Sequence, residues 1–176
     1  MGGDTTGADH DAGLQALLDE RAIRRLLLDY CRGIDRCDAE LVASVYHPDA
    51  TDDHGAFKGL GVDFAAYATD RLRAGCEATV HFLGDSLIDF HGPDRAVVET
   101  YVSAQHRRRD DAGPFLEWFG GRYVDRVERR HGRWAIADRV CIREWDKVER
   151  IELAFPPGRF TEGRRDRGDP CYGDRG

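Results

Sequence analysis

The chain has 176 residues and a formal net charge of −7 at pH 7, and its basic residues are nearly all arginine. This length favours one domain that can bury a core around a small cavity. The negative charge and the absence of a long basic block argue against a nucleic-acid partner. No apolar run approaches membrane-spanning length, so we expect no membrane association.

The N-terminal stretch MGGDTTGADHDAG lacks the basic and apolar regions of a secretory signal, and we expect residues 1–12 to be disordered. The cysteines are odd in number and scattered, with no C-x-x-C pair; they are Cys31, Cys37, Cys76, Cys141 and Cys171. This pattern is typical of a protein of the reducing cytoplasm rather than of a disulfide framework. The sequence has no cluster of ligands with zinc spacing, so we expect no metal site.

Apolar side chains recur at helical spacing between residues 13 and 34 and predict a first amphipathic helix. They are Ile23, Leu26, Leu27, Tyr30, Cys31 and Ile34. Asp38 has the character of an N-cap for a second helix, which Pro48 would stop. The stretch ATDDHGAFKG indicates a short strand or hairpin, and a third helix is expected from about residue 62 to Gly75.

After Gly75 the apolar period changes to two, which predicts long strands over 79–90, 95–109, 115–130 and 133–147. Their connections, HGPD, DDAGP and RHGR, have the composition of turns. Helices followed by an antiparallel meander predict the α+β class: one curved antiparallel sheet with helices on one face. We expect a single domain over 13–155 and a tail rich in proline, glycine and charge over 156–176, mobile at its end.

Strand parity gives orientations for two polar side chains. His106 shares a face with the apolar residues Val98, Val102 and Ala104, so it is expected to point inward. Arg139 shares a face with the small residues Ala135, Ala137 and Cys141, which would suit a cavity wall. The opposite assignment, with the bulky face as the core and Arg139 exposed, is equally compatible with the pattern.

Two further residues are ambiguous when taken alone. Asp35 follows the apolar Ile34 at the end of the first predicted helix, where aspartate is common simply because helices end in turns. His81 lies at the start of a predicted strand, a place where histidine is more often structural than catalytic. Neither residue identifies a site without the other.

Taken in order, several segments resemble the nuclear transport factor 2-like superfamily, and most closely its SnoaL-like branch. They are Tyr30-x4-Asp35, YHPDA, FKG, TVHFLGD, GGRYVDRVERRHGRW and Arg139. The resemblance runs from about Leu17 to about Phe155. That branch includes scytalone dehydratase, bile acid 7α-dehydratase and hexachlorocyclohexane dehydrochlorinase. It implies a cone, in which a strongly curved sheet wraps around the N-terminal helices and leaves an internal pocket at the open end.

The resemblance also implies roles for individual residues. Asp35 and His81 fall where these lyases keep an aspartate–histidine dyad, and Tyr30 falls where some keep a pocket tyrosine. Arg139 falls where some keep a pocket arginine. His106 lies on the strand that carries a second histidine in scytalone dehydratase.

These residue types suit proton removal beside a carbonyl or a leaving group. An imidazole such as His81 is a base near neutral pH, and the Asp35 carboxylate would fix its tautomer. Tyr30, His106 and Arg139 would stabilise the departing group or an enolate oxygen. This chemistry requires neither a metal nor an organic cofactor.

The sequence therefore predicts a cofactor-independent lyase, a dehydratase first of all, acting on a small cyclic apolar molecule. An isomerase or a polyketide-type cyclase would use the same pocket. A different class is a non-catalytic ligand-binding or assembly module, such as the small subunit of a ring-hydroxylating dioxygenase, which would not need the dyad. Family members with this dyad are often homotrimers and some are homodimers, so a homo-oligomer is expected.

Overall fold

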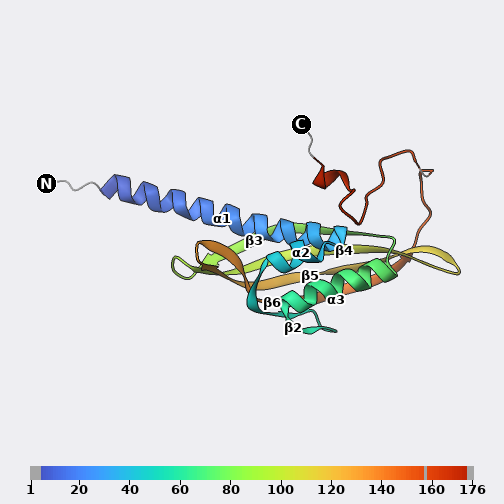
Figure 1. The fold of residues 1–176 in the computed structure, drawn as a ribbon, viewed down its shortest axis with the longest axis horizontal. Helices are drawn as coiled ribbons and strands as arrows, with labels where there is room; N and C mark the ends of the chain where they lie inside the picture. Colours follow the sequence, from blue (N-terminus) through green and yellow to red (C-terminus); the bar gives the residue numbers. More distant parts are fainter. Residues whose placement is uncertain (1–4, 157, 174–176) are drawn as a thin grey trace.

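The computed structural model describes residues 5–156 and 158–173 (Figure 1). The helices are α1 (Thr5–Arg36), α2 (Ala39–Ser44), α3 (Gly61–Gly75) and the short 3₁₀ turn η1 (Pro170–Tyr172). The strands are β1 (Tyr46–Asp53), β2 (Lys58–Leu60), β3 (Ala78–Phe90), β4 (Arg95–Asp110), β5 (Gly113–Arg130) and β6 (Arg133–Arg150). The order of elements is the predicted one, and the α+β class is confirmed.

The strands form one sheet in the order β2-β1-β6-β5-β4-β3. Strands β3 to β6 are joined by hairpins and pair antiparallel, as the meander predicts. The β5–β6 turn places His131 and Gly132 at positive φ, which matches the twist of a tight hairpin. The expectation of a wholly antiparallel sheet is wrong, because β1 pairs parallel with β6. No hairpin joins these two strands, so no turn geometry imposes an antiparallel pairing.

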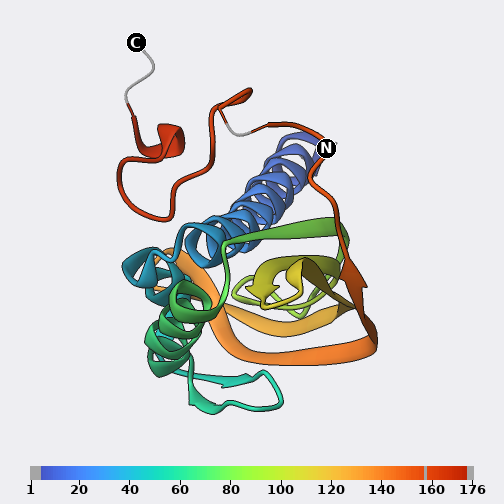
Figure 2. The same cartoon turned by 90° about the vertical axis from the view of Figure 1, so that its right-hand side faces the viewer.

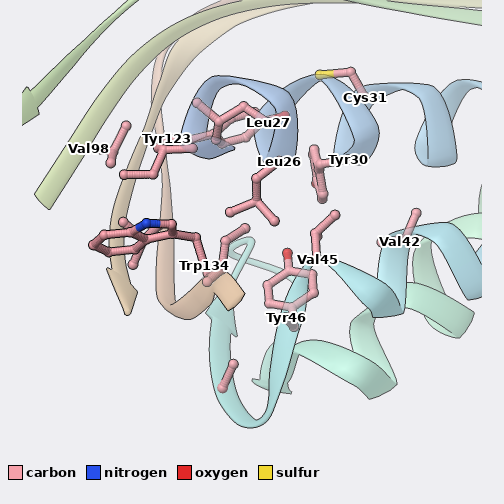
Figure 3. Close-up of a cluster of buried hydrophobic side chains, with 14 of the residues drawn as sticks. Leu26, Leu27, Tyr30, Cys31, Val42, Val45, Tyr46, Val98, Tyr123 and Trp134 are labelled. Atoms are coloured by element: carbon pink, nitrogen blue, oxygen red, sulfur yellow. The ribbon is translucent and has the colours of Figure 1, made fainter. Parts of the chain in front are cut away.

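The sheet curves strongly, and the helices lie on its concave side (Figure 2). Apolar side chains of α1 point towards the sheet and pack against side chains of β1, β5 and β6 (Figure 3). The buried cluster includes Leu26, Leu27, Tyr30, Val45, Tyr46, Tyr123 and Trp134. This core joins α1 and the start of β1 to the concave face of the sheet.

Helix α1 begins at Thr5, well before the predicted start at residue 13, so the expected disorder of residues 1–12 does not hold for 5–12. Residues 1–4 lie outside the described residues. The N-terminal part of α1 extends beyond the sheet (Figure 1) and exposes several leucines. None of the helices in the described part of the chain combines the length and apolarity needed to cross a membrane.

The described part of the C-terminal tail returns to the end of α1. Asp169 accepts a hydrogen bond from Arg36 at 2.9 Å, and the Tyr172 hydroxyl donates to Asp38 at 2.8 Å. Asp38 also caps α2, as predicted, by accepting from the backbone N–H of Leu41. The tail thus contacts the segment that follows directly on Asp35. The expected mobility of its last residues, 174–176, falls outside the described residues.

Candidate active site

A cavity of about 310 Å³ lies between α1, α3 and the concave face of the sheet. Most of its walls are aromatic or aliphatic, including Ile34, Phe64, Tyr67, Leu72, Phe119 and Tyr123. A small number of polar groups interrupt this lining: Tyr30, His54, Arg71, His81 and His106. An apolar cavity with a few convergent polar groups is typical of a small-molecule site.

Asp35 and His81 meet at the wall of this cavity. Helix α1 ends just after Asp35, because Cys37 adopts a left-handed conformation and the N–H of Asp38 returns to the carbonyl of Gly33 at 2.8 Å. This termination leaves Asp35 on the last turn, facing β3. Its Oδ1 lies 2.8 Å from His81 Nδ1, and its Oδ2 accepts the backbone N–H of His81 at 3.0 Å. The predicted contact is therefore present.

Both side chains are well shielded, with Asp35 9% exposed as a residue and the His81 side chain 8% exposed. The Thr79 hydroxyl donates a third hydrogen bond to Asp35 at 3.0 Å. The carboxylate is therefore held on both oxygens, and it holds the imidazole by Nδ1. No hydrogen bond from the described residues occupies Nε2 of His81, which is thus the nitrogen available to a ligand.

His106 faces the same cavity, as strand parity predicts. The His106 and His81 ring centroids are 5.6 Å apart. Burial, and then the neighbouring His81, lower the pKa of His106 to about 4. Its Nε2 is buried without a hydrogen-bond partner among the described residues. Near pH 7 His106 is therefore a neutral group that offers a hydrogen bond but no positive charge.

Arg139 does not reach the cavity, so the expectation that it lines the pocket is wrong. It is 0% exposed, and its Nε and Nη2 donate to the two oxygens of Asp125 at 2.7 and 2.6 Å. Asp125 and Arg139 are direct cross-strand partners on β5 and β6, which brings the two charges together. The guanidinium lies between Tyr30 and Tyr123, with its carbon 4.1 and 4.3 Å from their ring centroids. These rings separate Arg139 from the pocket.

Burial alone would lower the pKa of Arg139, but Asp125 and the surrounding groups outweigh it and raise the pKa well above its usual value. Arg139 therefore stays charged, and the partner carboxylate balances that charge. A buried pair of this kind is held by good geometry and is costly to break. The Arg139–Asp125 pair is therefore part of the protein core next to the site.

A second aspartate–histidine pair reaches the pocket, and the sequence analysis missed it. His54 lines the cavity and its Nδ1 bonds to Asp52, whose other oxygen accepts from the Tyr46 hydroxyl at 2.6 Å. On the pocket side, His54 Nε2 lies 3.2 Å from the Tyr30 hydroxyl. The available signal was the spacing Asp52-x-His54 at the end of β1, since residues two apart on an extended segment share a face.

Two cysteines lie close to the site. Cys141 lines the cavity and Cys31 is buried beside it on α1. Burial raises the pKa of each thiol to about 12. Near neutral pH both are protonated thiols, which are poor nucleophiles. Within the described residues no group of three or more histidine, cysteine, aspartate or glutamate side chains is placed to hold a metal ion.

The model of the SnoaL-like domain family matches residues 15–140. Solved structures share the fold. One is provisionally assigned as a scytalone dehydratase from Novosphingobium aromaticivorans; at 24% identity and a TM-score of 0.68, the match covers 83% of this chain and 97% of that one. A type 2 hexachlorocyclohexane dehydrochlorinase matches at 21% identity and a TM-score of 0.73, with 83% and 99% covered.

The type 3 dehydrochlorinase of Novosphingobium barchaimii matches at 19% identity and a TM-score of 0.72, covering 82% of this chain and 99% of that one. No protein with a curated description matches the sequence. Likeness at these identities establishes the cone fold.

Proposed function

Because the chain belongs to the SnoaL-like domain family, we propose that it is a cofactor-independent lyase in which His81 is the general base and Asp35 orients it. The observation that carries this proposal is the contact between Asp35 and His81 at the wall of an apolar cavity. The names of the similar structures, dehydratase and dehydrochlorinase, denote eliminations, and they support this class of reaction.

The geometry supports a separate role for each member of the pair in this proposal. With its Nδ1–H donated to Asp35, His81 has a free lone pair on Nε2, which takes a proton from a carbon beside a carbonyl or a leaving group. The imidazolium that results is stabilised by the carboxylate 2.8 Å away. The two other bonds to Asp35 keep this carboxylate in place while the charge develops.

The cavity suits a small ring. A volume of about 310 Å³ is at the lower end of the range for small-molecule sites. The aromatic walls favour an apolar body, and the polar groups are few enough to address one or two oxygens. We therefore propose a small cyclic ketone with a leaving group on the β-carbon as the substrate class.

The same proton transfer would serve an isomerase that moves a double bond, or a cyclase. A non-catalytic ligand-binding module is the alternative from another class. The pocket favours an enzyme, because a binding module has no need of a histidine oriented beside a cavity by a carboxylate that accepts three hydrogen bonds.

The test uses 3-hydroxycyclohexanone and 3-chlorocyclohexanone for elimination and cyclohex-3-enone for isomerisation, since all three yield cyclohex-2-enone. His81→Ala should lower the rate by about 10²–10⁴-fold. Asp35→Asn favours the wrong tautomer and should also be severe. The double variant should be little worse than the worse single one, because the pair acts as a unit. His91→Ala, at an exposed turn, is the matched control.

Ligand affinity should change less than turnover, because the lost interaction belongs mainly to the transition state. Additive losses would assign independent roles to the two residues. A His81→Ala variant as active as the wild type on every probe would place the protein in the binding class.

A further inference from the structure

A second proton-handling unit faces the pocket from the end of β1. His54 has Asp52 on one nitrogen and the Tyr30 hydroxyl, at 3.2 Å, on the other. Asp52 is itself fixed by the buried Tyr46 hydroxyl at 2.6 Å. The ring of His54 stacks on Phe64 with centroids 4.2 Å apart, so its orientation is set from α3 as well. Contacts on both ring nitrogens and on one ring face therefore fix the orientation of His54, which a purely structural histidine at a strand end does not require.

An elimination in which the leaving group departs as water needs a proton donor as well as a base. Arg139 is unsuited, because it is sealed behind two tyrosine rings and bound to Asp125. His106 is neutral near pH 7, and its Nε2 has no hydrogen-bond partner among the described residues that would supply it with a proton. Tyr30 lines the pocket, but burial raises its pKa well above the usual value, so it gives up a proton only if that proton is replaced at once.

We propose that His54 supplies the proton that the leaving group takes, that Tyr30 passes it on, and that Asp52 positions His54. This inference rests on the proposed function, because it presumes that His81 removes the proton from carbon. With protons on both nitrogens, His54 donates one to Asp52 and one to the Tyr30 oxygen. The Tyr30 proton is then directed into the cavity.

His81 Nε2 takes a proton from the α-carbon, and the C–H electron pair forms the new C=C bond. The bond from the β-carbon to the hydroxyl oxygen breaks, and its electron pair stays on that oxygen. The oxygen takes the Tyr30 proton as Tyr30 takes one from His54, and water leaves. One proton then returns from His81 to His54 through solvent.

This relay selects the class of leaving group. Hydroxide is a strong base and departs readily only if it is protonated, whereas chloride departs as an anion without a proton. A residue pair dedicated to delivering a proton therefore points to an oxygen leaving group. The inferred substrate is a cyclic β-hydroxy ketone, and the inferred reaction is dehydration rather than dehydrochlorination.

The kinetic test compares 3-hydroxycyclohexanone with 3-chlorocyclohexanone in the same variants. His54→Gln keeps a polar side chain but carries no exchangeable imidazole proton. It should slow the hydroxy substrate by about 10²-fold or more, the contribution of a general acid, and change the chloro substrate less than threefold, roughly. Tyr30→Phe should show the same selectivity, and the double variant should be no worse. His91→Gln, an exposed histidine, is the control.

The outcomes separate the two proposals. If His81→Ala abolishes both reactions but His54→Gln affects both equally, or neither, the donor role is wrong and the base role stands. If His81→Ala leaves both reactions unchanged, the proposed function itself is wrong.

A binding measurement decides the donor role even if neither probe reacts. 4-Nitrophenolate presents a ring oxyanion to the donor, and nitrobenzene has a similar shape without the oxygen. A charge-assisted hydrogen bond favours the phenolate by about tenfold or more. The ratio of the two affinities should therefore fall by that factor in His54→Gln. An unchanged ratio would overturn the donor role.

Discussion

Tyr30 separates two pairs of side chains, each made of a basic residue and a buried carboxylate. Behind its ring lies the ion pair of Arg139 and Asp125, which exposes no atom. Beside its hydroxyl lies the pair of His54 and Asp52, in which the histidine faces the cavity. Both pairs consist of a cation-forming side chain held by a buried carboxylate. The two pairs differ in whether a ligand in the cavity can reach them. The sealed pair can only stabilise the fold, whereas the pair that reaches the cavity can exchange a proton with a ligand.

The largest effect is expected from breaking the sealed pair. Asp125→Ala leaves the Arg139 charge buried without a partner and should lower the free energy of unfolding by about 3–5 kcal/mol. Urea denaturation measures this loss. Asp138→Ala removes a nearby carboxylate that accepts a hydrogen bond from Thr51 near the surface, and should cost less than about 1 kcal/mol.

Replacing both members of the pair should cost much less stability than replacing one. Asp125→Leu combined with Arg139→Met should recover most of the stability lost in Asp125→Ala, because no uncompensated charge remains. If the double variant is as unstable as the single one, the pair contributes more than charge balance.

A somewhat smaller loss of stability is expected on acidification, and it should arise from His106 on the pocket side. The pKa of His106 is about 4 in the folded protein against 6.5 ordinarily. Between these values the unfolded chain binds a proton that the folded protein does not, so stability falls as pH falls from 6.5 towards 4. The loss amounts to about 3 kcal/mol, and His106→Gln should remove it.

Urea unfolding of the wild type and His106→Gln at pH 7 and at about pH 4.5 measures this difference. His91→Gln serves as the control, because it removes an exposed histidine. Equal acid sensitivity in the wild type and His106→Gln would show that His106 is not held in its neutral form.

A smaller effect is expected from the carboxylate behind His54. Asp52→Asn should lower the rate on 3-hydroxycyclohexanone relative to 3-chlorocyclohexanone by about tenfold, since a charged hydrogen-bond partner contributes roughly 1.5 kcal/mol. Asp53→Asn, the adjacent residue paired with Lys58 at the surface, is the matched control. A loss shared equally by both substrates would indicate a structural role for Asp52.

No effect is expected from metal removal, because the proposed chemistry uses only imidazole, carboxylate and phenol groups. Dialysis against a chelator should leave turnover within about twofold of the untreated enzyme, an experimental margin well below the contribution of a catalytic group. A large loss restored by zinc or iron would contradict the mechanism.

The sequence predicted the order of elements well, because long amphipathic segments with clear stop signals are local properties. The contact of Asp35 with His81 could also be predicted, from the resemblance to the SnoaL-like branch. The parallel pairing of β1 with β6 was not, since it depends on where the chain re-enters the sheet. Arg139 was misplaced for a related reason: its partner, Asp125, is defined by strand register, which parity along one strand does not reveal.

His54 was overlooked because its segment was interpreted only as a strand or hairpin. Its pocket position depends on three elements meeting, with Tyr30 from α1, Phe64 from α3 and Asp52 from β1. No local sequence pattern predicts contacts between such distant segments, although the two-residue spacing between Asp52 and His54 was visible. Sites assembled by long-range packing are therefore the part of this molecule that required a structure.

The thiol in the cavity wall has a practical consequence for chemical probes. Burial raises the pKa of Cys141 to about 12, so at pH 7 its side chain is almost entirely the protonated thiol. Electrophilic fragments, which need a thiolate, should therefore label it very slowly even when they bind beside it. Useful inhibitors of this pocket would be reversible ring compounds, whose affinity comes from shape and from an oxygen placed against Tyr30.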